Sequence, residues 1–267
     1  DERVRLIMVI GGADTGKTTL VEGLADFLSN SFPTGVADLD MGQSHIGPPA
    51  TLAWGRVIGG FTKWHDIIIE DFYFTGAVSP PGNLLPAVVG AKHIVDRASA
   101  ECGKLVIDTT GLIYGPAGRV LKEYKIELLS PDMILALERE DELKGILSHL
   151  RFRKRPVVKR LRVPKEVALK SAALRSDYRG LKFREYFRGS RTVEVSSKDT
   201  GIRFTREADA KDLVGRIVSF RDEEKKDLAL GIIEGAEAGE GWYLVRTPLG
   251  VGSRFTTLVV GTAFATL

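Results

Sequence analysis

The sequence predicts an α/β fold, with a mostly parallel β-sheet flanked by helices and a small C-terminal all-β domain. Two observations carry this prediction. Short, wholly apolar segments alternate with segments of helical periodicity through residues 4–195, as in a parallel sheet covered on both faces. After about residue 206, short β-like runs are separated by turns rich in Gly, Asp and Glu. We expect a first domain at 1–206 and a second at 207–267.

The strands expected in the first domain are brief runs of aliphatic and aromatic residues. Several are apolar along their whole length, which is typical of strands buried on both faces. They are predicted at Val4–Ile10, Gly35–Leu39, Ile67–Phe74, Lys104–Thr109, Asp132–Leu137, Val157–Leu161 and Thr192–Val195.

The helices are predicted from apolar residues that recur every three or four positions. Leu20, Val21, Leu24, Phe27 and Leu28 show this spacing in the first of them. The predicted segments are Thr18–Leu28, Leu84–Ala100, Val120–Leu129, the amphipathic Asp141–Leu150 and the basic Lys165–Phe187. In the second domain, strands are expected at Val214–Phe220, Leu228–Ile233, Gly241–Val245 and Phe255–Val260.

A glycine-rich segment between the first strand and the first helix fits the pattern G-x-x-x-x-G-K-[ST] at every fixed position. Glycines let successive backbone N–H groups turn toward phosphate oxygens, and the helix start adds its dipole. Lys17 is expected to neutralise the β and γ phosphates, and Thr18 to offer its hydroxyl to Mg²⁺. The sequence therefore predicts a P-loop NTPase sheet that binds ATP or another NTP. The nucleotide-binding residues expected are Gly12, Ala13, Asp14, Thr15, Gly16, Lys17, Thr18 and Thr19.

Acidic residues end two of the predicted strands. Asp108 follows an apolar strand, where a P-loop protein holds Mg²⁺, usually through water. Asp38 and Asp40 end another strand and lie two residues apart, so they face the same side. One of them is expected to take a proton from an attacking hydroxyl or to hold a metal-bound water. The alternative is that the pair only caps N–H groups of its own loop, in which Gln43 is a further candidate for substrate contact.

The net charge of +3 conceals a strong asymmetry. Residues 151–191 contain 15 Lys or Arg and three acidic residues, and the rest of the chain is acidic. A basic block in an acidic protein favours a polyanionic ligand, although a solvated basic surface has the same composition. Arg175 and Arg179 lie four apart on one face of the predicted basic helix, where their guanidinium groups are suited to clamp phosphate. The cations between Arg151 and Arg162 are candidates for contact with a nucleic-acid backbone.

Other features of the composition exclude whole classes of protein. No apolar run reaches the 18 residues of a transmembrane helix, and the first residues do not resemble a signal peptide. Cys102 is the only cysteine, which excludes an internal disulfide and a multi-cysteine zinc site. We therefore expect a cytoplasmic protein without membrane contact. One glutamine and two asparagines, beside many charged residues, are typical of a thermophile.

An ordered set of motifs resembles the polynucleotide 5′-hydroxyl kinases related to the pre-mRNA cleavage factor kinase and the pre-rRNA processing kinase. The archaeal and bacterial-type members are the most similar. The resemblance covers roughly residues 4–195, and the D-x-D-x-G-Q-S loop and the R-x-x-x-R lid are more specific than the P-loop. The motifs are Gly11–Thr18, Asp38–Pro49, Thr75–Gly82, Asp108–Gly111 and Arg175–Arg179 leading to Phe183–Phe187.

The resemblance implies transfer of the γ-phosphate of ATP or another NTP to the 5′-hydroxyl end of RNA or DNA. By the same resemblance, Asp40 acts near the hydroxyl, and Arg175 and Arg179 belong to the lid. From its place at the strand end, Asp38 is expected to join Thr18 and Asp108 around the metal. Thr110 and Gly111 begin a clasp over the substrate end, and Gln43 lies in the loop of Asp40. The cleavage-factor members have tryptophan after the clasp glycine where this chain has Leu112, so their base stacking is not carried over to this position. The cleavage-factor members also have an N-terminal domain before the P-loop, which these 267 residues do not contain.

Three other functions share parts of this pattern. A small-molecule or nucleoside kinase would use the same P-loop without needing the basic block. A nucleotide-dependent RNA-processing scaffold without kinase activity would not need Lys17, Thr18, Asp40 and both arginines. A regulatory GTPase would carry an N-K-x-D guanine motif, which is absent from the sequence. The sequence does not identify protein partners.

Overall fold

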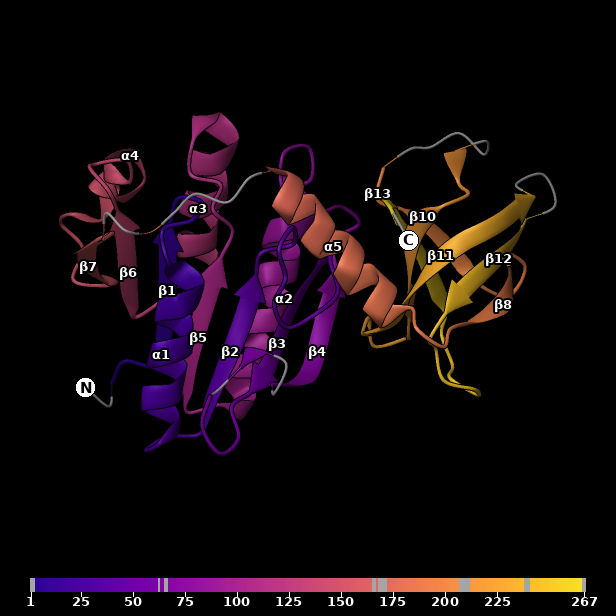
Figure 1. The fold of residues 1–267 in the computed structure, drawn as a ribbon, viewed down its shortest axis with the longest axis horizontal. Helices are drawn as coiled ribbons and strands as arrows, with labels where there is room; N and C mark the ends of the chain where they lie inside the picture. The colour runs from indigo at the N-terminus through magenta and orange to yellow at the C-terminus, as the bar shows by residue number, and fades with distance from the viewer. Residues whose placement is uncertain are drawn as a thin grey trace.

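Two β-sheets form the framework of the molecule, and a long helix runs across the junction between them (Figure 1). The computed structural model describes residues 3–61, 63–64, 67–164, 167, 172–206, 212–237 and 241–265. Among these residues, no helix is both long and apolar enough to cross a membrane.

The first sheet has seven strands in the order β4-β3-β2-β5-β1-β6-β7. Strands β1, β2, β5, β6 and β7 are parallel, and β3 and β4 join one edge in antiparallel pairing. The central strands β2 and β5 are buried at every position, whereas β7 at the edge is largely exposed. Their bounds are Leu6–Gly11 (β1), Thr34–Leu39 (β2), Thr51–Arg56 (β3), Ile68–Phe74 (β4), Lys104–Thr109 (β5), Met133–Glu138 (β6) and Val157–Arg162 (β7).

Helices cover both faces of this sheet, because alternate residues of each buried strand point to opposite sides. Val21 and Ala25 of α1 pack with strand residues such as Val9 and Val106 on one face. Helices α2, α3 and α4 pack on the other face, in a core that includes Met8. The helices are α1 (Lys17–Ser29), α2 (Leu84–Glu101), α3 (Gly115–Leu129), α4 (Lys144–Leu147) and α5 (Ala172–Tyr186).

The predicted elements of this domain are confirmed, with three differences. Strand β3 is an addition to the predicted strands. The amphipathic segment at 141–150 forms only the single turn of α4 and a 3-10 turn at Ser148–Leu150. Part of the predicted basic helix, at 165–166 and 168–171, lies outside the described residues, and the helix that is described begins at Ala172.

The second sheet has six strands in the order β8-β12-β11-β10-β13-β9. The strand predicted at Thr192–Val195 exists as β8, but it pairs with β12 and not with the first sheet. The second sheet therefore begins at Arg191, before the boundary expected near residue 206, because β8 and β9 find their hydrogen-bond partners in the later strands. The bounds are Arg191–Ser196 (β8), Gly201–Phe204 (β9), Arg216–Arg221 (β10), Asp227–Glu237 (β11), Trp242–Thr247 (β12) and Thr257–Phe264 (β13).

The edge strand β4 fastens the two sheets together. The backbone N–H of Phe74 donates to Asp227 Oδ2 of β11 at 2.8 Å. The carbonyl of Gly76 accepts the N–H groups of Thr262 and Ala263. Gly76 has a φ of +79° and lies so close to Thr205 that a Cβ would approach its side chain to 2.7 Å, so glycine is required here. The second sheet therefore continues the fold from β4 and is not an independent appendage.

Helix α5 is anchored in the second sheet by its C-terminal half. Phe183 and Phe187 are buried in a core that also contains Phe74 and Leu230. The Tyr186 hydroxyl accepts the N–H of Leu230 at 2.9 Å. The sheet thus fixes one end of α5, and the other end extends over the carboxyl ends of the first sheet (Figure 1).

We predict that Asp227→Ala lowers the free energy of unfolding by about 3–5 kcal/mol, because it leaves the buried Arg221 guanidinium without its counter-charge. Asp227 is fully buried, and its two oxygens accept Arg221 Nε at 2.9 Å and an Arg221 Nη at 2.8 Å. Chemical denaturation measures the loss. The control is Asp96→Ala, which removes an exposed i,i+4 pair with Lys92 and is expected to cost about 1 kcal/mol at most. Equal losses in the two variants would contradict the prediction.

Candidate active site

The P-loop between β1 and α1 has the tight geometry that phosphate binding needs. Gly16 has a φ of +83°, which a residue with a side chain rarely adopts. A Cβ on Gly11 would come within 2.7 Å of the Leu137 carbonyl oxygen and of Thr15 Oγ1. Lys17 begins α1, and its Nζ donates to the Gly12 carbonyl at 2.5 Å. Burial is the main cause that lowers the Lys17 pKa, against the opposing charge of Asp108.

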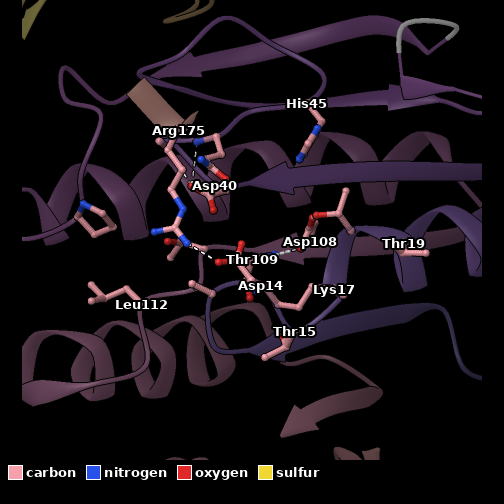
Figure 2. A pocket seen from close by; sticks show the side chains of 18 of the residues that line it. Asp14, Thr15, Lys17, Thr19, Asp40, His45, Asp108, Thr109, Leu112 and Arg175 are labelled. Carbon is pink, nitrogen blue, oxygen red and sulfur yellow. Dashed lines mark hydrogen bonds and ion pairs between the residues drawn. The ribbon is translucent and has the colours of Figure 1, made fainter. Parts of the chain in front are cut away.

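A cavity of about 640 Å³ lies over the carboxyl ends of the parallel strands. Its walls come from the loops that follow β1, β2, β4 and β5 and from the first turns of α5. Figure 2 shows Lys17, Asp40, Asp108 and Arg175 around this space. The predicted residues that line it are Ala13, Asp14, Thr15, Gly16, Lys17, Thr18, Thr19, Asp40, Gln43, Asp108, Thr110, Gly111, Arg175 and Arg179.

Gly12 and Asp38 are the two predicted site residues that do not line this cavity. Gly12 acts through its carbonyl, which accepts Lys17 Nζ and the Thr15 hydroxyl. Asp38 is completely buried, and its oxygens accept the N–H groups of Asp40, His45 and Ile46 and the hydroxyl of Ser44. The geometry thus makes Asp38 the residue that orders the loop after β2. The metal contact expected of Asp38 stays a prediction.

Asp40 belongs to the same loop but faces the cavity. Its Oδ1 accepts the N–H groups of Gly42 at 2.9 Å and Gln43 at 3.2 Å. The expectation that a carboxylate caps this loop is therefore correct for Oδ1. Among the described residues, no hydrogen bond is recorded to Oδ2, which makes it the oxygen available to a ligand.

Thr18 and Asp108 meet at the centre of the cavity. The Thr18 hydroxyl donates to Asp108 Oδ2 at 2.9 Å. A hydroxyl beside a carboxylate is a hard oxygen donor set that suits Mg²⁺, which uses few protein ligands and keeps water or phosphate for the rest. Consistent with this, the described residues contain no group of three or more His, Cys, Asp or Glu that would hold a metal by themselves.

Negative charge is crowded at the ends of β2 and β5. The strand register pairs Asp38 with Asp108 across neighbouring strands. Burial, and then the charge of Asp40, raises the pKa of Asp38 to about 6. Burial, and then the charge of Asp38, raises the pKa of Asp108 to about 6, although Lys17 and the Thr18 hydroxyl oppose this. The site therefore has carboxylates whose ionisation depends on nearby cations.

The first turns of α5 form a lid over the P-loop. Arg175 makes an ion pair with Asp14 at 2.5 Å, drawn as a dashed line in Figure 2. Arg179 lines the same cavity and makes no ion pair with another described side chain. Tyr178 and Lys182 contact the loop after β2 through the carbonyls of Ser44 and His45. The predicted lid is thus already in contact with both the P-loop and the loop of Asp40.

Sequence analysis assigned no role to several residues that line or support the cavity, although His45 and the loop Val78–Pro81 lie within its motifs. His45 and Trp64 lie at its rim with ring centroids 5.1 Å apart, and the loop Val78–Pro81 after β4 closes another side. Two buried lysines of α3, Lys122 and Lys125, lie below the ends of β2 and β5. The one available signal for these lysines was their position on the same helical face as Ile126 and Leu129.

The fold separates the basic segment into two surfaces. Arg175 and Arg179 line the cavity, and Lys182 contacts the loop after β2. In contrast, β7 and the preceding loop lie at the opposite end of the sheet from β4. Arg155 and Arg160 there form ion pairs with Asp132 and Glu138. The cations between Arg151 and Arg162 are therefore not adjacent to the loops that follow β2 and β4. The contact of these cations with a nucleic-acid backbone stays a prediction.

Comparisons with known proteins agree with the motifs. Residues 11–189 match the model of the mRNA cleavage and polyadenylation factor CLP1 P-loop family. A Pyrococcus horikoshii protein named polyribonucleotide 5′-hydroxyl-kinase is 34% identical over 93% of this chain and 67% of its own length. A Methanocaldococcus jannaschii protein of the same name is 36% identical over 75% of this chain and 55% of its own length. The chain thus spans between about half and two thirds of these relatives.

The fold of the chain is also similar to a solved structure. Clp1p in a complex with Pcf11p aligns with a TM-score of 0.73 over 98% of this chain and 74% of that chain. The sequence identity is 14%, so this comparison supports the fold alone.

We predict that Asp38 and Asp108 make the protein less stable as pH rises from about 4 to above about 6. This holds for the protein without nucleotide or divalent ion. Their pKa values are raised to about 6 in the folded protein, from 3.8, so the folded state binds more protons than the unfolded chain in this window. Asp108→Asn removes one of these carboxyls and also removes its charge from the surroundings of Asp38. Relative to the parent, it should therefore gain more stability at about pH 7.5 than at about pH 4.5.

Denaturation of parent and Asp108→Asn in the presence of a chelator measures this difference at both pH values. Comparing the free energies of unfolding of variant and parent cancels the contributions of other titrating groups. Asp132 and Glu142 are examples, because their hydrogen bonds lower their pKa values. A difference that does not depend on pH would contradict the prediction.

Proposed function

This chain belongs to the mRNA cleavage and polyadenylation factor CLP1 P-loop family, and we propose that it is a polynucleotide 5′-hydroxyl kinase. One observation carries the proposal: Asp40 lines the same cavity as the P-loop and both lid arginines. A carboxylate, a phosphate-binding loop and two guanidinium groups around one space are the parts needed to transfer a phosphoryl group to a hydroxyl. The relatives named polyribonucleotide 5′-hydroxyl-kinase support this class of acceptor.

In the proposed reaction, the P-loop N–H groups and Lys17 bind the phosphates of ATP or another NTP. Lys17 exchanges its bond to the Gly12 carbonyl for bonds to the phosphates. Thr18 and Asp108 would hold Mg²⁺, which supplies positive charge to the phosphate oxygens when bound. This part of the site binds and orients the donor.

Asp40 orients the 5′-hydroxyl and accepts its proton at Oδ2. The hydroxyl oxygen forms a bond to the γ-phosphorus while the bond from that phosphorus to the β–γ bridging oxygen breaks, and the nucleoside diphosphate leaves. Arg175 is expected to move from Asp14 to the transferring group, where Arg179 joins it. Positioning and charge neutralisation supply most of the rate enhancement in such a transfer.

The acceptor is proposed to be the end of an RNA or DNA strand and not a free nucleoside. Helix α5 continues past the cavity toward the second sheet and carries further basic residues, Lys182 and Arg184. We propose that these residues contact phosphates downstream of the 5′ end. Phosphate contacts of this kind depend on salt and do not identify bases.

The experiment that tests the proposal is transfer of labelled γ-phosphate from ATP to a set of acceptors: 5′-hydroxyl RNA, 5′-hydroxyl DNA, the same RNA with a 5′-phosphate, and a nucleoside. We expect product with the 5′-hydroxyl strands, none with the 5′-phosphate strand, and a KM that falls over the first few nucleotides and rises with salt. Efficient transfer to the nucleoside without salt dependence would instead support a small-molecule kinase. No transfer to any acceptor would support a nucleotide-dependent scaffold.

Asp40→Asn is predicted to lower kcat by about 10²–10⁴-fold, the usual range for loss of a general base, with the KM for ATP changed by less than about threefold. The reason is that Asp40 faces the acceptor side of the cavity and holds its loop through Oδ1, which an amide oxygen can still do. Steady-state kinetics with both substrates varied measure the two parameters. If Asp38→Asn abolishes turnover while Asp40→Asn stays close to the parent, the roles of the two carboxylates are reversed.

Arg175→Ala and Arg179→Ala are each predicted to slow transfer by about 10²–10⁴-fold, near the lower range for loss of a transition-state arginine. Both side chains line the cavity from one face of α5. Single-turnover rates at saturating ATP measure the effect. With the acceptor also saturating, Arg184→Ala is the matched control and should remain within about twofold of the parent. Arg184 is an exposed arginine of the same helix, and a contact with downstream phosphates affects acceptor binding and not the transfer step. Parent rates in both lid variants would show that this face of α5 takes no part in transfer.

A further inference from the structure

Helix α3 carries two lysines on its buried side, an unusual place for charged side chains. Lys122 is completely buried and Lys125 is 1% exposed, among the apolar residues Ile126 and Leu129 of the same face. A lysine without an interaction partner is strongly unfavourable at such a position, so each amine must find acceptors in the interior.

Both lysines contact the ends of the strands that carry the site. Lys122 Nζ donates to Thr109 Oγ1 at 2.8 Å and to the Thr110 carbonyl at 2.5 Å, just after Asp108. Lys125 Nζ donates to the Leu39 carbonyl at 3.3 Å, just before Asp40. The amines thus reach the carboxyl ends of β5 and β2 from the side of the sheet opposite α1.

The two amines differ in their electrostatic surroundings. Burial, and then the charge of Lys125, lowers the pKa of Lys122 well below its ordinary value. Lys122 donates two hydrogen bonds, and a neutral amine has two N–H groups to donate. Burial lowers the pKa of Lys125 only to about 8, because the charges of Asp40 and Asp38 favour its ammonium form. At neutral pH, Lys125 is therefore a cation beside the carboxylates of the β2 loop.

Lys17 also lies near Asp40, and the proposed reaction requires it for the donor phosphates. When Lys17 engages the donor, the charge of Asp40 must be balanced from elsewhere. Lys125 is held inside the protein and does not leave for a ligand.

We propose that Lys125 is a positioning residue that holds Asp40 in place through the Leu39 carbonyl and balances its charge while Lys17 binds the donor. The inference rests on the proposed kinase function for its effect on turnover. The expected effect on the loop Asp40–Ile46 does not depend on that function. It follows from the contact of Lys125 with the Leu39 carbonyl of β2.

The test compares two substitutions of Lys125 in the full chain. Lys125→Met removes the charge and the hydrogen bond in a side chain of similar length. Lys125→Gln removes the charge but keeps N–H donors. The matched control is Lys104→Met, because Lys104 is also buried and donates to a backbone carbonyl, that of Val4, at the other end of β5.

For turnover, both Lys125 variants are expected to lose about 10–10²-fold in kcat, as a misplaced catalytic group does, with the KM for ATP within about twofold of the parent. Lys104→Met should lower the melting temperature without a comparable loss of kcat. An equally large fall in kcat in Lys104→Met would overturn the positioning role. So would a loss of ATP affinity in the Lys125 variants as large as their loss of kcat.

For the loop, hydrogen exchange is measured on the protein without substrate. The amides of Gly42 and Gln43, which donate to Asp40, should exchange about tenfold faster in Lys125→Gln, and the P-loop amides should be unchanged. Unchanged exchange at these two amides would overturn the inference whether or not the parent is a kinase. An inactive parent with the expected exchange change would overturn the proposed function and leave the inference on Lys125 supported.

Discussion

The repulsion between carboxylates at the ends of β2 and β5 is the constraint on which the rest of the site depends. Parallel pairing places Asp38 beside Asp108, and Asp40 follows two residues later. A protein that places three acidic groups so close together, two of them buried, must supply cations and N–H donors around them. The loop after β2 provides the donors for Asp38, and the cations come from Lys17 on one side of the sheet and Lys125 on the other.

This arrangement explains why the loop after β2 has its particular shape. Asp38 collects the N–H groups of Asp40, His45 and Ile46, which folds the chain back over the strand end. Asp40 is left at the surface of that fold, facing the P-loop across the cavity. Helix α5 then contacts the same loop through Tyr178, while its other end is fixed in the second sheet by Phe183 and Phe187. The second sheet is thereby connected mechanically to the lid, although it contributes no residue to the cavity lining within the described part of the chain.

Local patterns predicted much of this, and tertiary contacts account for what they did not. The P-loop, the central strands and Asp108 follow from apolar runs and glycine positions, which depend on short-range physics. The membership of β8 in the second sheet depends on pairing with β12, some fifty residues later, and no local pattern carries that information. The residues alone did not separate the tasks of Asp38 and Asp40, because alternation along a strand gives them the same side. The family resemblance assigned Asp40 to the hydroxyl, and the folded loop shows which N–H groups each carboxylate accepts. Lys122 and Lys125 were missed because lysines on a helix are ordinarily solvated.

The central claim is that the donor held by the P-loop and the acceptor hydroxyl beside Asp40 react directly in one cavity. The stereochemical course of transfer from a nucleotide whose γ-phosphorus is chiral tests this claim most directly. Direct in-line attack by the 5′-oxygen predicts inversion of configuration at phosphorus in the product. Retention would require two successive displacements through a phosphorylated group of the protein, and would contradict the account.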